Sequence, residues 1–456
     1  MIHISPEITQ SRSDFLLTPC APYGTYSQSF RVPSSKPETQ RALIMAAQAD
    51  GVSHIYNDLR CSETDTMKQA FRCFGVDVVE KDDHLVVSGC GGQFKYNNQV
   101  IDSKGSGLVF RVFTALATTV DSPVIISGDS TLRKRIMAPL FQALRQLGAD
   151  IDCIVEPDRA PIVNWQASLQ GGECTIPGNL SSQFITAVLL AAPLAQQTVD
   201  ITVTDEVYSQ SYIQQTVAMM RNAGVQVDVT PGLDHFTVQP TAPRAARVDL
   251  SGDYTSASYL LAWAALFPGM TTLKNLREES LQGEREIIEM MRALGLGIVF
   301  DAENDTVFIQ NNLDGLKGDY HFDIRNCPNI APTLAAISAF VEGSFKVTGA
   351  AITRFHKCSR VEAIANELQK LGVDIQPIYT DDNACDGFVT HGRHSYEGGE
   401  ILSSWGDHRL FMSLYIASLR MKNSNKIDGH RDIICSYPSF LEQFNFLTHQ
   451  TAVLQA

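Results

Sequence analysis

The sequence of 456 residues predicts an α/β protein built from six compact repeats, each with two helices and several strands. Two interleaved helix–strand patterns and a common interval predict this class. The interval is marked by Gly75, Gly148, Gly224, Gly295 and Gly372, which follow one another 71 to 77 residues apart. Intervals of this length exceed those of solenoid repeats, so compact α/β units are favoured over a rod.

The first pattern is a helical stretch that ends in a Leu-Gly-like step and leads into β-branched residues. Glycine is the expected residue just after a helix, because it accepts the left-handed conformation without a Cβ clash. A sixth copy without the glycine is predicted at 439–447. The five copies with the glycine lie at 67–79, 139–151, 216–227, 288–299 and 363–375.

The second pattern has small and apolar residues at helical spacing that lead into alternating β-branched residues. The first thirty or so residues show neither pattern, so we expect them to form an irregular extension. The six copies lie at 42–55, 113–126, 187–203, 257–273, 331–347 and 411–427.

The composition predicts a soluble globular protein, with 44% hydrophobic and 19% charged residues. No apolar run approaches the roughly 18 to 20 residues that span a bilayer. The start of the chain has neither the basic nor the apolar region of a secretion signal, so we expect a cytoplasmic protein. The ten cysteines form no C-x-x-C pair, which favours reduced thiols over a disulfide framework or a zinc site.

The net charge of −14, without a run of lysine and arginine, argues against nucleic acids and anionic membranes as main partners. Such a protein can still bind small anions where its few basic residues converge. These residues are concentrated in loops, as Lys36 with Arg41, Arg111, 133–135, 354–360 and Arg409.

The loop 34–41 presents Lys36 and Arg41 at the start of a predicted helix, beside its free backbone N–H groups. Such a helix start can bind an anion, although a solvated basic helix start is the alternative for this loop alone. For the other loops the alternatives are capping, turns and solvated charge. If the repeats are arranged symmetrically, six helix N-termini face one cleft and attract a substrate with several phosphates or carboxylates. The similar loops are 104–111, 128–135, 181–183, 209–212, 251–258, 354–360 and 406–409.

Taken in order, these motifs resemble the enolpyruvyl transferases, and among them the 5-enolpyruvylshikimate-3-phosphate (EPSP) synthases. The resemblance covers about residues 33 to 445. It implies a two-domain inside-out α/β barrel with six βαβαββ-like units, three in 34–249 and three in 1–33 plus 250–456. It also implies transfer of the enolpyruvyl group of phosphoenolpyruvate (PEP) to a hydroxyl by induced fit, with phosphate release and without a metal or cofactor. We expect a monomer.

The resemblance assigns residues to both substrates. Apart from the catalytic positions, three positions depart from the family pattern: Cys435 replaces a lysine, Pro37 a serine and Ile352 an asparagine. The implied PEP-binding residues are Lys36, Gly107, Arg135, Gln183, Arg360 and Arg409. The implied acceptor-binding residues are Arg41, Ser181, Ser182, Ser209, Tyr212, Asn329 and His356.

The catalytic positions differ most from the family. Asn329 stands where the family has an aspartate, and a carboxamide cannot accept a proton as a carboxylate does. His356 and Lys357 stand where the family has a Lys-Glu pair. Our hypothesis is that His356, with an ordinary pKa near about 6.5, is the general base. Lys36 or Lys357 is then the acid.

Most of the implied PEP-binding residues match the family, whereas several acceptor-binding positions differ. This pattern favours an enolpyruvyl transferase that uses a different acceptor. The predicted acceptor is a phosphorylated cyclic alcohol other than shikimate 3-phosphate, such as a nucleoside monophosphate in specialised metabolism. One alternative is an EPSP synthase that acts on shikimate 3-phosphate. The other is a homologue that binds anions without catalysis.

Overall fold

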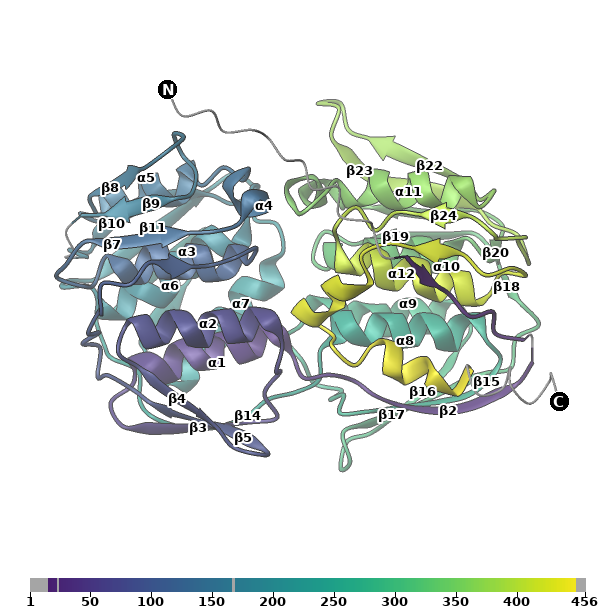
Figure 1. The fold of residues 1–456 in the computed structure, drawn as a ribbon, viewed down its shortest axis with the longest axis horizontal. Helices are drawn as coiled ribbons and strands as arrows, with labels where there is room; N and C mark the ends of the chain where they lie inside the picture. The colour runs from purple at the N-terminus through teal and green to yellow at the C-terminus, as the bar shows by residue number, and fades with distance from the viewer. Residues whose placement is uncertain (1–14, 23, 166–168, 448–456) are drawn as a thin grey trace, which may run out of the picture.

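The structure, a computed structural model, describes residues 15–22, 24–165 and 169–447. It has two lobes side by side, with helices that run toward the gap between them and sheets on the outside (Figure 1). Part of the predicted N-terminal extension, residues 1–14 and 23, lies outside the described residues. The described part of the extension forms two strands, so the expectation of an irregular segment is wrong there.

The first lobe holds three four-stranded sheets. In spatial order they are β14 (Arg247–Asp249), β3 (Val52–Tyr56), β5 (His84–Ser88), β4 (Asp77–Glu80); β6 (Ile101–Asp102), β7 (Val124–Ser127), β9 (Ile162–Asn164), β8 (Ile151–Cys153); and β10 (Gly172–Pro177), β11 (Val199–Thr204), β13 (His235–Val238), β12 (Val227–Val229). Its helices are α1 (Lys36–Gln48), α2 (Ser62–Cys73), α3 (Gly107–Ala117), α4 (Ser130–Arg133), α5 (Ala138–Gln146), α6 (Ser182–Ala191), η1 (Ala192–Leu194) and α7 (Gln210–Asn222).

The second lobe holds two sheets of the same kind, a three-stranded sheet and a short strand pair. In spatial order they are β2 (Tyr26–Arg31), β15 (Gly269–Lys274), β17 (Thr306–Asn311), β16 (Gly297–Asp301); β19 (Tyr320–Asp323), β21 (Phe345–Thr348), β23 (Cys385–His391), β22 (Asp374–Tyr379); β24 (Ile401–Leu402), β25 (Lys426–Ile427), β1 (Leu16–Leu17); and β18 (Leu316–Lys317), β20 (Val341–Glu342). Its helices are α8 (Tyr254–Leu266), η2 (Gly283–Glu286), α9 (Ile287–Ala293), η3 (Pro328–Ile330), α10 (Ala331–Ser338), η4 (Ala351–Phe355), α11 (Arg360–Lys370), α12 (His408–Leu419), η5 (His430–Cys435) and η6 (Leu441–Phe444).

Every four-stranded sheet repeats one topology, in which a parallel pair is followed by two antiparallel neighbours. The five predicted glycines all have φ between 75° and 98°, so each ends its helix in the left-handed conformation. Helices α3 and α8 are buried along their whole length, because most of their side chains are apolar or small. This arrangement, with helices inside and sheets outside, confirms the predicted two-lobe inside-out α/β fold.

The sixth unit is completed by the N-terminal segment. Strand β24 pairs in parallel with β25, and β1 then pairs antiparallel with β25 in the place of a third strand. The helix predicted at 439–447 is only the short 3₁₀ helix η6. The aromatic side chains of this stretch pack into the core instead: Phe440 and Phe444 contact Tyr415 and each other.

Two hydrophobic cores divide the chain. One is formed between Ala42 and Leu250, and the other by Ala21–Val32 together with Tyr254–Leu447. The chain passes between them twice, and the two crossing segments pair with each other through an antiparallel bridge from Ser34 to Gly252. The proposed domains are therefore residues 34–249 and residues 1–33 together with 250–456.

Candidate active site

Five of the predicted anion-binding loops lie at the starts of helices that are capped by local side chains. Each capping oxygen accepts a hydrogen bond from a backbone N–H in the first turn of its helix, which fixes the following side chains in place. The capped helices are α1 (by Ser35), α3 (Ser106), α6 (Ser181), α8 (Asp253) and α12 (Asp407). Ser181 therefore has the capping role that was the alternative for its loop.

Gly107 is the point where three polar side chains of the first lobe meet. A Cβ atom added to Gly107 would lie 2.7 Å from a guanidinium nitrogen of Arg111, 2.8 Å from one of Arg135 and 3.5 Å from Oε1 of Gln183. A larger residue at this position would push the two guanidinium groups out of their present places. The structure thus brings together Gly107, Arg135 and Gln183, three of the predicted PEP-binding residues.

Arg111 gives this cluster an excess of positive charge. Its side chain is buried, donates to Gln183 and lies over the ring of Phe184 at 4.8 Å, while its Nε has no hydrogen-bond partner among the described residues. Burial, and then the neighbouring Arg135, lowers the pKa of Arg111 to about 9. A buried cation without an acidic partner is costly, so this corner is built for an anion. Arg111 belongs to a predicted loop, but the sequence did not single it out for the site.

Lys36, the first residue of α1, forms an ion pair with Glu63 on α2, with 3.1 Å between Nζ and Oε2. Burial disfavours the ammonium, but Glu63 holds the pKa of Lys36 above its ordinary value. Burial alone would raise the pKa of Glu63, yet Lys36 and then Lys357 lower it. Glu63 was not predicted, because an acid in the first turn of a helix is ordinary.

Arg360 of the second lobe is held by a buried ion pair. Its Nε lies 2.7 Å from Oδ2 of Asp407, and its Nη1 donates to Oδ1 of Asn329 at 2.8 Å. Arg360 also lies within electrostatic range of Arg135, while Arg409 lies within range of Lys36. The four cations Lys36, Arg135, Arg360 and Arg409 therefore converge from both lobes.

Tyr212, Glu284 and Asn329 form a hydrogen-bonded triad across the two lobes. The hydroxyl of Tyr212 donates to Oε1 of Glu284 at 2.6 Å. Nδ2 of Asn329 donates to the same carboxylate at 3.1 Å and to the Tyr212 hydroxyl at 2.8 Å. Glu284 is the second acid that the sequence missed, since it sits in a short 3₁₀ turn outside both repeated patterns.

Most of the N–H donors of Arg41 are taken up by hydrogen bonds within the protein. Its guanidinium donates to the hydroxyl of Thr216 and to the backbone oxygen of Tyr212, and these two bonds hold α1 against α7. A third donor is used within α1, by the backbone oxygen of Pro37, so three of the five N–H donors are taken. Burial lowers the pKa of Arg41 to about 10. At most two N–H donors of Arg41 are left for an acceptor. The role of Arg41 in acceptor binding stays a prediction.

The three predicted serines lie at helix starts of the first lobe. Ser182 is the first residue of α6 and is buried, beside the cap Ser181. Ser209 precedes α7 with a φ of 55° and donates its backbone N–H to the carbonyl of Arg325, in the second lobe, at 3.3 Å. Their contacts with an acceptor stay predictions.

His356 and Lys357 lie just before α11. Burial, and then Arg360, lowers the pKa of His356 well below its ordinary value, and its Nδ1 has no hydrogen-bond partner. The imidazole is therefore neutral and weakly basic at neutral pH. Lys357 acts on Glu63 electrostatically, so it belongs to the group of charges around Lys36.

Some predicted positions lie outside the convergence. Arg133 donates to the carbonyl of Gly128, and Arg354 faces solvent near Asp382 and lies over the ring of Phe355. Cys435, in contrast, is buried within electrostatic range of Lys36. The lysine that the family pattern has at position 435 would therefore have faced the same group of charges.

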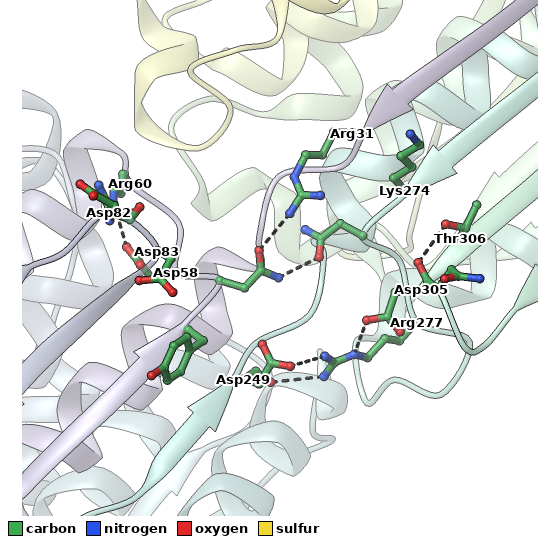
Figure 2. A pocket seen from close by; sticks show the side chains of 14 residues that line it. Arg31, Asp58, Arg60, Asp82, Asp83, Asp249, Lys274, Arg277, Asp305 and Thr306 are labelled. Atoms are coloured by element: carbon green, nitrogen blue, oxygen red, sulfur yellow. Dashed lines mark hydrogen bonds and ion pairs between the residues drawn. The ribbon is translucent and has the colours of Figure 1, made fainter.

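A cavity of about 610 Å³ lies at the hinge, away from all the residues above (Figure 2). Arg277 bridges the two lobes there, with Nη2 2.9 Å from Oδ2 of Asp249 and Nε 3.0 Å from Oδ2 of Asp305. Lys274 and Arg31 lie on the second-lobe side, and Asp58 lies on the opposite side. None of the predicted site residues lines this cavity.

The comparisons with known proteins bear on this geometry. The sequence model of the family EPSP synthase (3-phosphoshikimate 1-carboxyvinyltransferase) matches residues 22–444. The chain belongs to the EPSP synthase family.

Two relatives of this EPSP synthase family member match it over most of its length and of their own. A 3-phosphoshikimate 1-carboxyvinyltransferase of Methanosarcina acetivorans is 33% identical over 425 residues, which cover 91% of this chain and 94% of the relative. The Methanocaldococcus jannaschii protein of the same name is 32% identical over 417 residues, or 90% of this chain and 94% of the relative. The chain is accordingly an enolpyruvyl transferase, as the resemblance implied.

Two solved structures share the fold. An EPSP synthase from Acinetobacter baumannii has a TM-score of 0.78 at 23% identity and covers 95% of this chain and 98% of its own. The enolpyruvyl transferase NikO from Streptomyces tendae has a TM-score of 0.74 at 16% identity, covering 96% and 98%. Within the part of the chain that the structure describes, no helix is long and apolar enough to cross a membrane.

Proposed function

We propose that this chain transfers the enolpyruvyl group of PEP to a hydroxyl of shikimate 3-phosphate and releases phosphate. From the sequence alone, this acceptor is one of the two alternatives to a changed acceptor. The relatives named for it, at 29–33% identity over about nine tenths of the chain, now favour it over a nucleoside monophosphate.

The observation that carries the PEP half of the proposal is the positively charged cluster at Gly107. PEP carries a phosphate and a carboxylate, and the cluster offers Arg111 and Arg135 without a carboxylate in hydrogen-bond contact with Arg111. Arg360 and Arg409 approach from the second lobe. Binding PEP would neutralise these charges, so it would also favour the closed arrangement of the lobes.

The proposed chemistry has two steps. In the first, the acceptor oxygen bonds to C2 of PEP, its proton passes to a base, and an acid protonates C3. In the second, C3 returns its proton, the C2–O bond to phosphate breaks, and the phosphate leaves with the acceptor's proton. Lys36 suits the acid role, because its raised pKa keeps it protonated at neutral pH. His356 as the base stays a prediction, and its lowered pKa weakens the case.

A different acceptor is the second candidate, and Asn329 is the observation that favours it. The acceptor side lacks a carboxylate there and has Pro37 in place of a hydroxyl. A changed acceptor pocket would leave this pattern beside an intact PEP side. A cytoplasmic location, a monomeric state and the absence of a cofactor stay predictions.

The experiment is phosphate release from PEP with shikimate 3-phosphate, and separately with a panel of nucleoside monophosphates. The proposal expects one phosphate per enolpyruvyl ether formed from shikimate 3-phosphate, with Arg135→Met strongly impaired. Release only with a nucleoside monophosphate would establish the second candidate. PEP binding by calorimetry, without release for any acceptor, would instead indicate a homologue that only binds anions.

A further inference from the structure

The triad of Tyr212, Glu284 and Asn329 joins the two lobes in the acceptor half of the site. Tyr212 lies on α7 of the first lobe, while Glu284 and Asn329 lie on η2 and η3 of the second. Its three hydrogen bonds, of 2.6, 2.8 and 3.1 Å, form a closed ring. The lobes must therefore be together for the ring to exist.

Asn329 has a fixed orientation in this ring. Its Oδ1 accepts from Nη1 of Arg360 at 2.8 Å, and a guanidinium can only donate, so the Nδ2 group must face Glu284 and Tyr212. Asn329 consequently donates to both neighbours and accepts from neither. It cannot receive a proton from an acceptor hydroxyl.

Glu284 is the carboxylate that the acceptor half retains. It is 1% exposed, and its two side-chain partners are the Tyr212 hydroxyl and the Asn329 amide, both neutral donors. A buried carboxylate without a cation in direct contact is readily protonated. Burial accordingly raises the pKa of Glu284, so this carboxylate binds a proton more readily than an exposed one does.

Tyr212 links this carboxylate to the site. Its hydroxyl proton points to Glu284, while its oxygen already accepts from Asn329 and has a second lone pair to accept another hydrogen bond. An acceptor hydroxyl that donates to Tyr212 would thus be joined to Glu284 by two hydrogen bonds in series.

We propose that Glu284, acting through the hydroxyl of Tyr212, receives the proton of the acceptor hydroxyl during enolpyruvyl transfer; this rests on the proposed function. As the acceptor oxygen bonds to C2 of PEP, its proton moves to the oxygen of Tyr212. The proton of Tyr212 moves at the same time to Oε1 of Glu284, so Tyr212 stays neutral. When phosphate leaves, Tyr212 donates its hydroxyl proton to the leaving phosphate and takes back the proton held by Glu284, so both groups return to their starting state.

In this arrangement Tyr212 is the catalytic group and Glu284 acts through it. The site then needs no carboxylate at position 329, and Asn329 holds Tyr212 and Glu284 in register. His356 is a poorer alternative, because burial and the cations Arg360, Arg409 and Arg135 outweigh Asp407 and hold the pKa of His356 well below its ordinary value.

The test compares Glu284→Gln and Tyr212→Phe with Glu286→Gln in the full chain. Glu286 is a matched control, since it is a carboxylate on the same turn that contacts Cys327 rather than the triad. The turnover number is measured against pH with PEP and the acceptor found for the wild type, and PEP affinity by calorimetry.

Glu284→Gln and Tyr212→Phe should each lower turnover about 100- to 10,000-fold. PEP affinity should stay within about twofold, and Glu286→Gln should behave like the wild type. The wild-type turnover number should fall at acidic pH, and this fall should be absent from the residual turnover of Glu284→Gln. A merely structural Glu284 would leave that acidic limb of the profile in place.

Retention of the acidic limb in Glu284→Gln, or turnover within about threefold of wild type, would overturn the relay. Should Glu284→Gln fail to fold, Tyr212→Phe decides by the same criterion. Wild-type protein without turnover on any acceptor would instead reject the proposed function itself, and the two failures are therefore distinguishable.

Discussion

Nδ2 of Asn57 donates to Oδ1 of Asn275 at 2.7 Å, and this bond joins the two lobes at the hinge. The two asparagines occupy equivalent positions, directly after β3 and β15, and both have positive φ, 55° and 66°. Asn57 also donates to the carbonyl of Leu250 at 2.8 Å, and Asn275 to that of Val32 at 2.9 Å. Each asparagine thus binds one of the two crossing segments.

Replacing Asn57 should therefore loosen the hinge. Asn57→Ala removes the bonds to Asn275, Leu250 and Ser34 and leaves buried partners unpaired. We expect the free energy of unfolding to fall by about 2–4 kcal/mol in urea titrations. Asn383→Ala is the control, because Asn383 has a φ of 60° and an exposed side chain, so it should cost only about 1 kcal/mol. Equal losses in the two variants would contradict the hinge role.

Arg135 should contribute to PEP affinity far more than its neighbour. Arg135→Met removes a cation of the Gly107 cluster, whereas Lys134→Met removes an exposed one. Loss of a charged hydrogen bond costs about 1.5–3 kcal/mol, so calorimetry should show PEP affinity about 10- to 100-fold weaker for Arg135→Met only. Similar affinities for both variants would mean that PEP does not contact this cluster.

Glu63 should set the pH range over which Lys36 works as an acid. Glu63→Gln removes the group that raises the pKa of Lys36, so that pKa should fall. An acid must be protonated to act, and the alkaline limb of turnover against pH should therefore move to lower pH. Asp65→Asn, on the same helix but paired with Lys68, should leave the limb in place. An unmoved limb in Glu63→Gln would reject Lys36 as the acid.

Asp407 should stabilise the fold only above acidic pH. Burial would raise its pKa, but the guanidinium of Arg360 holds it well below the ordinary value. A group with a depressed folded pKa stabilises above its unfolded pKa, about 3.9, and loses that contribution as pH falls below it. Asp407→Asn should cost about 3–5 kcal/mol at pH 7, since Arg360 is left buried and unpaired.

That cost should shrink below about pH 4, in urea titrations at several pH values. Asp381→Asn, at an exposed position, is the control. A difference between wild type and Asp407→Asn that stays constant down to pH 3 would contradict the pairing.

The repeats were predictable because their signals are local. A glycine such as Gly148 ends a helix by its own backbone preference, and a cap such as Ser106 starts one by its own side chain. Lys36, Arg360 and Arg409 could be placed in one site because each follows such a start. The helix predicted at 439–447 failed where aromatic packing outweighed helical spacing.

What depends on partners distant in the chain could not be predicted. Strand β1 completes a sheet with β25, more than 400 residues away, and β14 joins β3 across a whole lobe. The partners of Glu63 and Glu284 lie on other elements of the folded chain, so the sequence around each acid does not reveal them. Glu63 looks like any acid in the first turn of a helix, and no local signal marks Glu284.

The most direct test of the account is the product formed from PEP and shikimate 3-phosphate by the wild-type chain. Mass spectrometry and phosphate release should show one enolpyruvyl ether for each phosphate, and far less of both with Arg135→Met at the same protein and PEP concentrations. A wild-type chain that binds PEP yet forms no ether with shikimate 3-phosphate would contradict the proposed acceptor.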